Sequence, residues 1–182
     1  MTVRTRRWIA IRVLCLGALG GSAACGGSTN DDDANRGDGA TVAESRNVPA
    51  GREVDVERIV DGDTIVVAGG ERVRLIGVDT PESVKPGTPV ECFAKEASRH
   101  LESLIPPGVA VVLVADVEPT DRYDRTLAYV YRASDGLFVN EALVADGYAN
   151  VATFPPNVAH VDDFLAAERA ARRADRGLWS AC

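Results

Sequence analysis

Residues suited to phosphate chemistry gather in one stretch of the sequence, from Arg74 to Glu82. The stretch holds an arginine, the carboxylates of Asp79 and Glu82, and the hydroxyl of Thr80. The apolar residues before Asp79 predict a β-strand, and Pro81 ends it because proline cannot donate a sheet hydrogen bond. We therefore expect charged side chains to be held where a strand ends, a common position for a working site.

Two further segments carry side chains that complement this stretch. The Asp-Gly-Asp-Thr segment at residues 61–64 contributes Asp63, and residues 121–125 contribute Tyr123 and Arg125. Carboxylate oxygens suit a hard divalent cation, and forked guanidinium groups suit phosphate. Each segment alone has an ordinary explanation as a turn, a loop start or a surface arginine. Their combination predicts a site for phosphodiester chemistry.

The motifs and their order resemble the staphylococcal nuclease-like (thermonuclease) family. The three main motifs are Asp61-Gly62-Asp63-Thr64, Arg74-Leu75-x-x-Val78-Asp79-Thr80-Pro81-Glu82 and Asp121-x-Tyr123-x-Arg125-x-Leu127-Ala128-Tyr129-Val130-Tyr131. Further matches are Glu96-Ala97-Ser98, Val139-Asn140-Glu141-Ala142-Leu143-Val144 and Gly177-Leu178-Trp179. The resemblance spans roughly residues 53–180.

This resemblance implies a cofactor and a reaction. Calcium would be held by Asp63, Asp79 and the backbone carbonyl of Thr80, because Ca²⁺ accepts irregular oxygen shells completed by water. The reaction implied is hydrolysis of DNA or RNA that leaves 3′-phosphate ends. The resemblance does not say which nucleic acid is preferred.

The resemblance also implies the catalytic residues. Glu82 would act as general base, or would orient the attacking water. Arg74 and Arg125 would grip the phosphate and stabilise the charge of the transition state. Arg→Lys at either position is expected to be costly, because lysine lacks the planar fork.

Three more residues are expected near the substrate. Tyr123 either hydrogen-bonds the phosphate or lines the pocket, with a packed aromatic residue as the alternative. Phe154 is expected to stack on a base of a single strand. Lys85 is the single lysine of the loop after Glu82.

The chain is long enough for one domain with a core, with 182 residues of which 46% are hydrophobic. We expect strands near residues 52–60, 64–68, 71–78, 109–114, 127–131 and 137–139. We expect helices near residues 92–104, 140–146 and 162–173, with Asn140 capping the second. This pattern alone predicts an α+β fold, and the resemblance implies a five-stranded OB-type β-barrel with about three α-helices.

The first fifty residues predict an export signal and a linker. Residues 1–24 combine an arginine-rich start, a short apolar run and small residues, typical of a bacterial signal peptide. Cys25 follows where a lipoprotein carries its acylated cysteine, although ordinary signal cleavage and either the Sec or the Tat route remain open. The acidic residues 25–50 predict a disordered linker, and residues 51–182 the folded domain.

Cys92 and Cys182 remain as a pair if Cys25 is acylated. In an oxidising compartment we expect them to form a disulfide, with two free thiols as the alternative. In the chain-entropy model, a disulfide that closes a loop of about ninety residues contributes roughly 4–5 kcal/mol to stability, less any strain.

The overall charge argues against general attraction to polyanions. The net charge is -7, and removal of residues 1–24, which hold four arginines and no acidic residue, makes it -11. Substrate binding should therefore depend on local arginines and on metal. We expect an exported nuclease, surface-anchored or secreted, that is monomeric and touches the membrane only through a lipid at Cys25. The alternative is a non-catalytic OB-type module that binds nucleic acid or calcium.

Overall fold

The computed structural model describes residues 48–83, 87 and 89–182. They belong to one compact unit, Val42–Cys182. The predicted signal peptide, Cys25, Lys85 and most of the predicted linker lie outside the described residues.

Five strands close into a barrel in the order β1-β2-β3-β6-β5. All neighbours are antiparallel except β3 and β6, which are parallel. The strands are β1 (Arg52–Ile59), β2 (Thr64–Val67), β3 (Glu71–Leu75), β5 (Ala110–Val114) and β6 (Thr126–Arg132). Alternating valine, isoleucine and leucine side chains fill the barrel, as period-two patterning requires. The predicted five-stranded barrel is confirmed.

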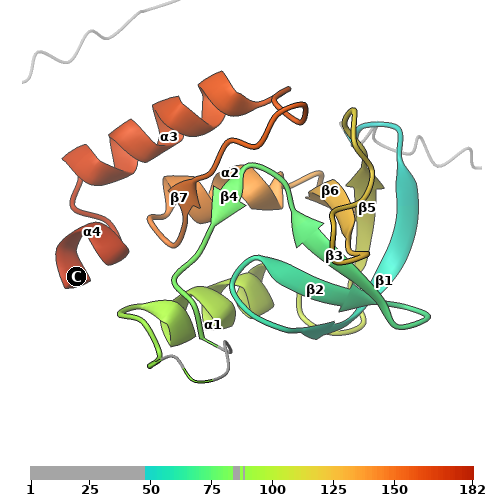
Figure 1. The fold of residues 1–182 in the computed structure, drawn as a ribbon, viewed down its shortest axis with the longest axis horizontal. Coiled ribbons are helices and arrows are strands. Elements are labelled where there is room, and N and C mark those ends of the chain that lie inside the picture. The colour runs from blue at the N-terminus through green and yellow to red at the C-terminus, as the bar shows by residue number, and fades with distance from the viewer. Residues whose placement is uncertain (1–47, 84–86, 88) are drawn as a thin grey trace, which may run out of the picture. The chain divides into compact units, whose positions relative to one another are not determined.

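The helices gather at one side of the barrel (Figure 1). They are α1 (Ala94–Leu104), α2 (Val139–Ala145), α3 (Val161–Arg173) and the single turn α4 (Leu178–Ala181). The short α2 contacts α1, α3 and β6 and so links the helices to the barrel. On α1, Ala94, Ala97 and Leu101 are buried at helical spacing. Within the described residues, no helix has the length and apolar character needed to span a membrane.

The predicted strand over residues 71–78 is interrupted, which corrects the sequence prediction. The strand β3 ends at Leu75, and the chain turns before β4 (Val78–Asp79), which pairs with β7 (Asn150–Val151). Gly77 makes this turn possible, because its φ is 80° and a Cβ there would lie 2.3 Å from a ring carbon of Phe164. The turn redirects the chain, so that Asp79 no longer belongs to the barrel wall.

Asn140 is not the helix cap that the sequence predicted. The helix α2 begins at Val139, and Phe138, predicted in a strand, forms only a single bridge with Tyr131. Asn140 is fully buried inside the first turn of α2. Its Oδ1 accepts a hydrogen bond from Val130 N–H at 2.9 Å, and its Nδ2 donates to the Ile76 carbonyl at 2.8 Å. The side chain thereby joins α2 to β6 and to the turn after β3.

A disulfide joins Cys92 and Cys182, as predicted. Their Cα atoms lie 6.0 Å apart and are separated by 90 residues in the sequence. The bond connects the residue after α4 to the segment that enters α1.

Candidate active site

The predicted metal ligands and catalytic residues line one polar cavity of about 210 Å³. Its lining residues are Asp61, Asp63, Arg74, Asp79, Thr80, Pro81, Glu82 and Arg125. They come from the turn after β1, from β3, from the end of β4 and from the segment before β6. The structure therefore brings together all six residues that the sequence proposed for metal and catalysis.

The turn before β2 places Asp63 beside Thr80. Asp63 is 6% exposed. Its Oδ2 accepts hydrogen bonds from Thr80 N–H at 3.0 Å and from the Thr80 hydroxyl at 3.2 Å. A Cβ on Gly62 would lie 2.6 Å from Thr80 Oγ1, so only glycine lets the two segments approach this closely. Two hydrogen bonds therefore hold Asp63 and Thr80 together.

Arg74 lies between two of the carboxylates. It alternates along β3 with the buried Val73 and Leu75 and so points away from the barrel core. Its Nη1 forms an ion pair with Asp63 Oδ2, and its Nη2 lies 2.9 Å from Asp79 Oδ1. Burial lowers the pKa of Arg74, and the neighbouring carboxylates oppose this shift. A guanidinium remains charged at neutral pH in such surroundings.

The donor atoms of this cavity are oxygens, the type of ligand that a hard divalent cation prefers. Four carboxylates and the oxygens of Thr80 line the cavity, without a sulfur or imidazole ligand. Across residues 48–83, 87 and 89–182, no three acidic, histidine or cysteine side chains already converge to hold an ion. Arg74 is paired with two of the donors, Asp63 and Asp79. The donor set therefore suits a hard divalent cation, and the guanidinium competes for the same oxygens.

Asp61 is a fourth carboxylate, to which the sequence analysis assigned no role. Burial raises its pKa, while a hydrogen bond with Thr64 and the charges of Arg74 and Arg125 lower it by less. Its Oδ1 accepts a hydrogen bond from Asp63 N–H at 3.2 Å. In the sequence, Asp61 lies two residues before Asp63 with one glycine between them, and this position could have placed it at the site.

Arg125 is held by Asp121, a second residue that sequence reasoning left without a role. Arg125 donates through Nε to Asp121 Oδ2 at 2.8 Å and through its main-chain N–H to Oδ1 at 3.0 Å. Burial raises the pKa of Asp121, but these bonds and one from Tyr123 N–H outweigh it and bring the pKa below its ordinary value. The Asp-x-x-x-Arg spacing of Asp121 and Arg125 across a turn could have predicted this ion pair from the sequence.

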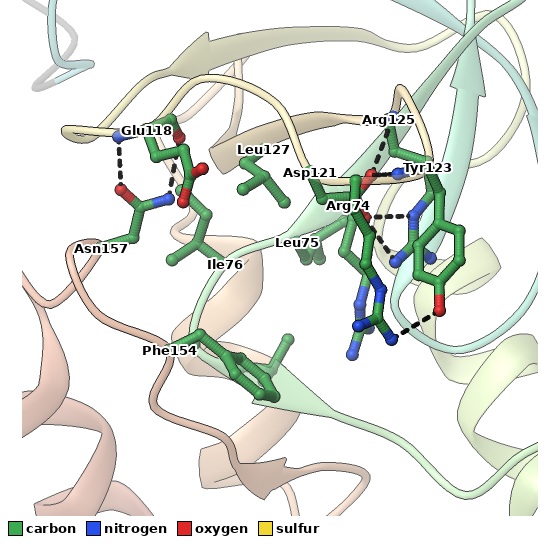
Figure 2. Close-up of a pocket in the computed structure, with 13 residues that line it drawn as sticks. Arg74, Leu75, Ile76, Glu118, Asp121, Tyr123, Arg125, Leu127, Phe154 and Asn157 are labelled. Carbon is green, nitrogen blue, oxygen red and sulfur yellow. Dashed lines mark hydrogen bonds and ion pairs between the residues drawn. The ribbon is translucent and has the colours of Figure 1, made fainter.

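A second cavity, of about 400 Å³ and more apolar, adjoins the first (Figure 2). Arg74 and Arg125 line both cavities. Tyr123 and Phe154 come from separate segments of its wall and are 63% and 71% exposed. The packed-aromatic alternative for Tyr123 is therefore wrong. Its hydroxyl accepts a hydrogen bond from Arg122 at 2.7 Å.

Asn157 fixes the segment that carries Phe154. It accepts a hydrogen bond from Glu118 N–H and donates one to the Glu118 carbonyl, each at 2.8 Å. Asn157 is 4% exposed, so this paired contact is shielded from water. Figure 2 shows the contact at the side of the cavity away from Tyr123. The wall that bears Phe154 is thereby attached to the loop after β5.

Comparison with known protein families matches residues 72–181 to the staphylococcal nuclease homologue family. The chain belongs to this family. The family predicted from the sequence is confirmed, and the matched residues run from β3 through α4. The match includes Arg74, Glu82 and Arg125 and begins after Asp63.

Individual relatives extend the comparison. A thermonuclease of Staphylococcus intermedius is 41% identical over 121 residues, covering 65% of this chain and 70% of that protein. A thermonuclease of Staphylococcus hyicus is 39% identical over 126 residues, with the same two coverages. The endonuclease YncB of Bacillus subtilis is 37% identical over 123 residues, covering 65% of this chain and 57% of that protein.

Proposed function

We propose that this protein is a Ca²⁺-dependent nuclease that hydrolyses phosphodiester bonds of DNA or RNA and leaves 3′-phosphate ends. Family membership and the similarity to thermonucleases and an endonuclease support a hydrolase that acts on nucleic acids. The calcium dependence, the product ends and the roles of individual residues belong to the proposal.

The observation that carries the proposal is the position of the two arginines. Arg74 and Arg125 line both a carboxylate-rich cavity and an apolar cavity. A phosphate bound between the two guanidinium groups would have oxygen ligands for a metal on one side and exposed aromatic rings on the other. A nucleotide unit has the same division into an anionic phosphate and a flat apolar base.

Asp63, Asp79 and the carbonyl of Thr80 would hold Ca²⁺. The bound ion would supply positive charge to a phosphate oxygen. Arg74 would exchange at least one of its carboxylate partners for the phosphate, since both Asp63 and Asp79 now pair with it. The same exchange would free those carboxylates as ligands.

The remaining steps are assigned to side chains of this chain. Glu82 would accept a proton from water at a carboxylate oxygen, or orient that water. Arg74 and Arg125 would hold the phosphate and stabilise its increased charge in the transition state. Phe154 would stack on a base, and Tyr123 and Lys85 would contact the backbone of the nucleic acid.

The test is Glu82→Gln, with Glu102→Gln as a matched control on an exposed position of α1. We expect Glu82→Gln to keep the fold and Ca²⁺ binding while turnover falls by about 10²–10⁴-fold, the usual contribution of a general base. Cleavage of single-stranded DNA and of RNA would be measured with Ca²⁺ and with chelator, and the product ends identified.

Two outcomes would contradict parts of the proposal. If the Glu82 variant cleaves like the parent protein, the role of Glu82 is wrong. If the folded parent protein cleaves neither substrate but retains single strands, the non-catalytic binding module is the better description.

We also propose that the domain is exported and attached by a lipid at Cys25, after removal of residues 1–24. The support is the arginine-rich, apolar and small-residue pattern that ends at this cysteine. Incorporation of a labelled fatty acid into the parent protein, and its loss in Cys25→Ser, would support the anchor. A Cys25→Ser variant that stays equally membrane-associated would exclude it.

A further inference from the structure

Glu82 is held by a residue that lies outside the cavity described above. The main-chain N–H of Glu82 donates to Glu91 Oε2 at 2.9 Å. In return, the main-chain N–H of Glu91 donates to the Glu82 carbonyl at 3.0 Å. One residue, nine positions further along the chain, therefore binds both main-chain polar groups of Glu82.

Glu91 is itself attached to rigid parts of the domain. Its carbonyl accepts a hydrogen bond from Ala94 N–H at 3.2 Å, and Ala94 is fully buried at the start of α1. The next residue, Cys92, is bonded to Cys182. Phe93 follows, with its ring centroid 5.1 Å from that of Tyr148. A packed helix end, an aromatic contact and a disulfide thus fix the segment that contains Glu91.

We propose that Glu91 is a positioning residue for Glu82. Its carboxylate holds the Glu82 main chain, and through it the Glu82 side chain, at the edge of the cavity. The inference rests on the proposed role of Glu82 in proton transfer. Hydrolysis depends on the distance between the base and the attacking water, and a misplacement near 1 Å can cost about 10²-fold in rate.

The side chain of Glu91 is the part that mutation can test, because the Glu91 main-chain N–H is retained when alanine or glutamine replaces this residue. Alanine removes the acceptor for Glu82 N–H. Glutamine keeps a carbonyl oxygen of the same reach, so it can accept the same hydrogen bond. Glu91 is exposed, so neither change opens a core cavity.

The experiment uses the full chain with a single-stranded DNA oligonucleotide and saturating Ca²⁺. We expect Glu91→Ala to lower kcat by about 10–100-fold with little change in KM, since the substrate is gripped elsewhere. Glu91→Gln should restore most of the loss. Glu102→Ala, which removes an exposed carboxylate from α1, should behave like the parent protein. Thermal unfolding of each variant separates a loss of position from a loss of fold.

A double-mutant cycle decides whether Glu91 acts through Glu82. Glu91→Ala should have almost no effect on kcat in a Glu82→Gln background, because there is no longer a base to position. An equal loss in both backgrounds would overturn the inference, as would a failure of Glu91→Gln to restore activity. If Glu82→Gln lowers kcat and Glu91→Ala does not, the inference alone is wrong. If Glu82→Gln has no effect, the proposed role of Glu82 fails and the inference fails with it.

Discussion

The two arginines of the site show how single side chains are prepared for an anion. Arg74 is bound by Asp63 and Asp79, and Arg125 is bound by Asp121. These carboxylates offset the cost of burying a cation and hold each guanidinium in one orientation. They also reduce the positive charge that a phosphate would meet. Affinity should therefore come from geometry and metal rather than from excess positive charge.

Arg125→Lys is expected to reduce kcat/KM by about 100-fold, in the range seen when one transition-state donor is removed. Lysine keeps the charge but cannot bind Asp121 through Nε while presenting two further donors to a phosphate. Steady-state cleavage of a single-stranded oligonucleotide would measure the loss. Arg99→Lys, on the exposed face of α1, is the control and should have no effect. Full activity of Arg125→Lys would mean that a point charge suffices at this position.

Asp121 should make the free energy of unfolding of the domain depend on pH in the acidic range. Its pKa in the folded protein is below the ordinary value, so its contribution is present above about pH 4 and is lost as the pH falls through the folded pKa. Asp121→Asn should therefore lower the free energy of unfolding at pH 7 and have progressively less effect below pH 4. Urea unfolding of both proteins at several pH values would measure the difference. A difference that stays constant with pH would contradict this assignment.

At the scale of elements, the turn between β3 and β4 determines where the site lies. Arg74 is on the barrel side of this turn and Asp79 lies beyond it, where β4 pairs with β7. Asn140 of α2 holds the turn through the Ile76 carbonyl, and Gly77 lets α3 pack against it. The helices α2 and α3 thus help to hold Arg74 and Asp79, which lie on opposite sides of this turn, at the same site.

Gly77→Ala is expected to destabilise the domain by about 2–5 kcal/mol, combining the cost of a left-handed alanine with overpacking against Phe164. Gly70→Ala is the matched control. Its φ of 79° is nearly the same as the 80° of Gly77, but no atom lies within 4 Å of the added Cβ. The control should therefore cost only the backbone part, about 1–2 kcal/mol. Equal midpoints of urea unfolding for the two variants would show that the Phe164 ring shifts to accept the added methyl group without a loss of stability.

At the scale of the whole molecule, the disulfide closes a loop that contains most of the domain. Cys92 and Cys182 bracket α1, two barrel strands and the remaining helices. A link of this span restricts the unfolded chain strongly, which is its main stabilising effect in the chain-entropy model. It also connects the C-terminal turn to the segment that positions Glu82.

Reduction of this disulfide is expected to lower the free energy of unfolding by roughly 4–5 kcal/mol, the value for a loop near ninety residues. Urea unfolding with and without dithiothreitol would measure the change in the parent protein. A Cys92→Ser, Cys182→Ser double variant should match the reduced protein and be insensitive to reductant. A parent protein whose stability is unaffected by reductant, after complete reduction is verified, would contradict the expectation.

Much of the fold could be predicted from local patterns in the sequence. The apolar patterns indicated the strands, and the helical spacing of Ala97 and Leu101 indicated α1. The closed barrel was implied by the family resemblance and not by these patterns. The spaced motifs around Asp63, Asp79 and Arg125 indicated the family and the site. Each of these signals depends on neighbours within a few residues, which is why it is visible before folding.

Only the tertiary structure decided how those side chains are paired. The strand is interrupted at Gly77, where the ring of Phe164, which is far away in the sequence, leaves no room for a Cβ. The burial of Asn140 follows from contacts with β6 and with the turn after β3. The contact between Glu91 and Glu82 joins two residues that lie nine positions apart in the sequence. Local patterns specify which residues can do chemistry. Long-range packing specifies which of them meet, because distances between remote segments depend on the whole fold.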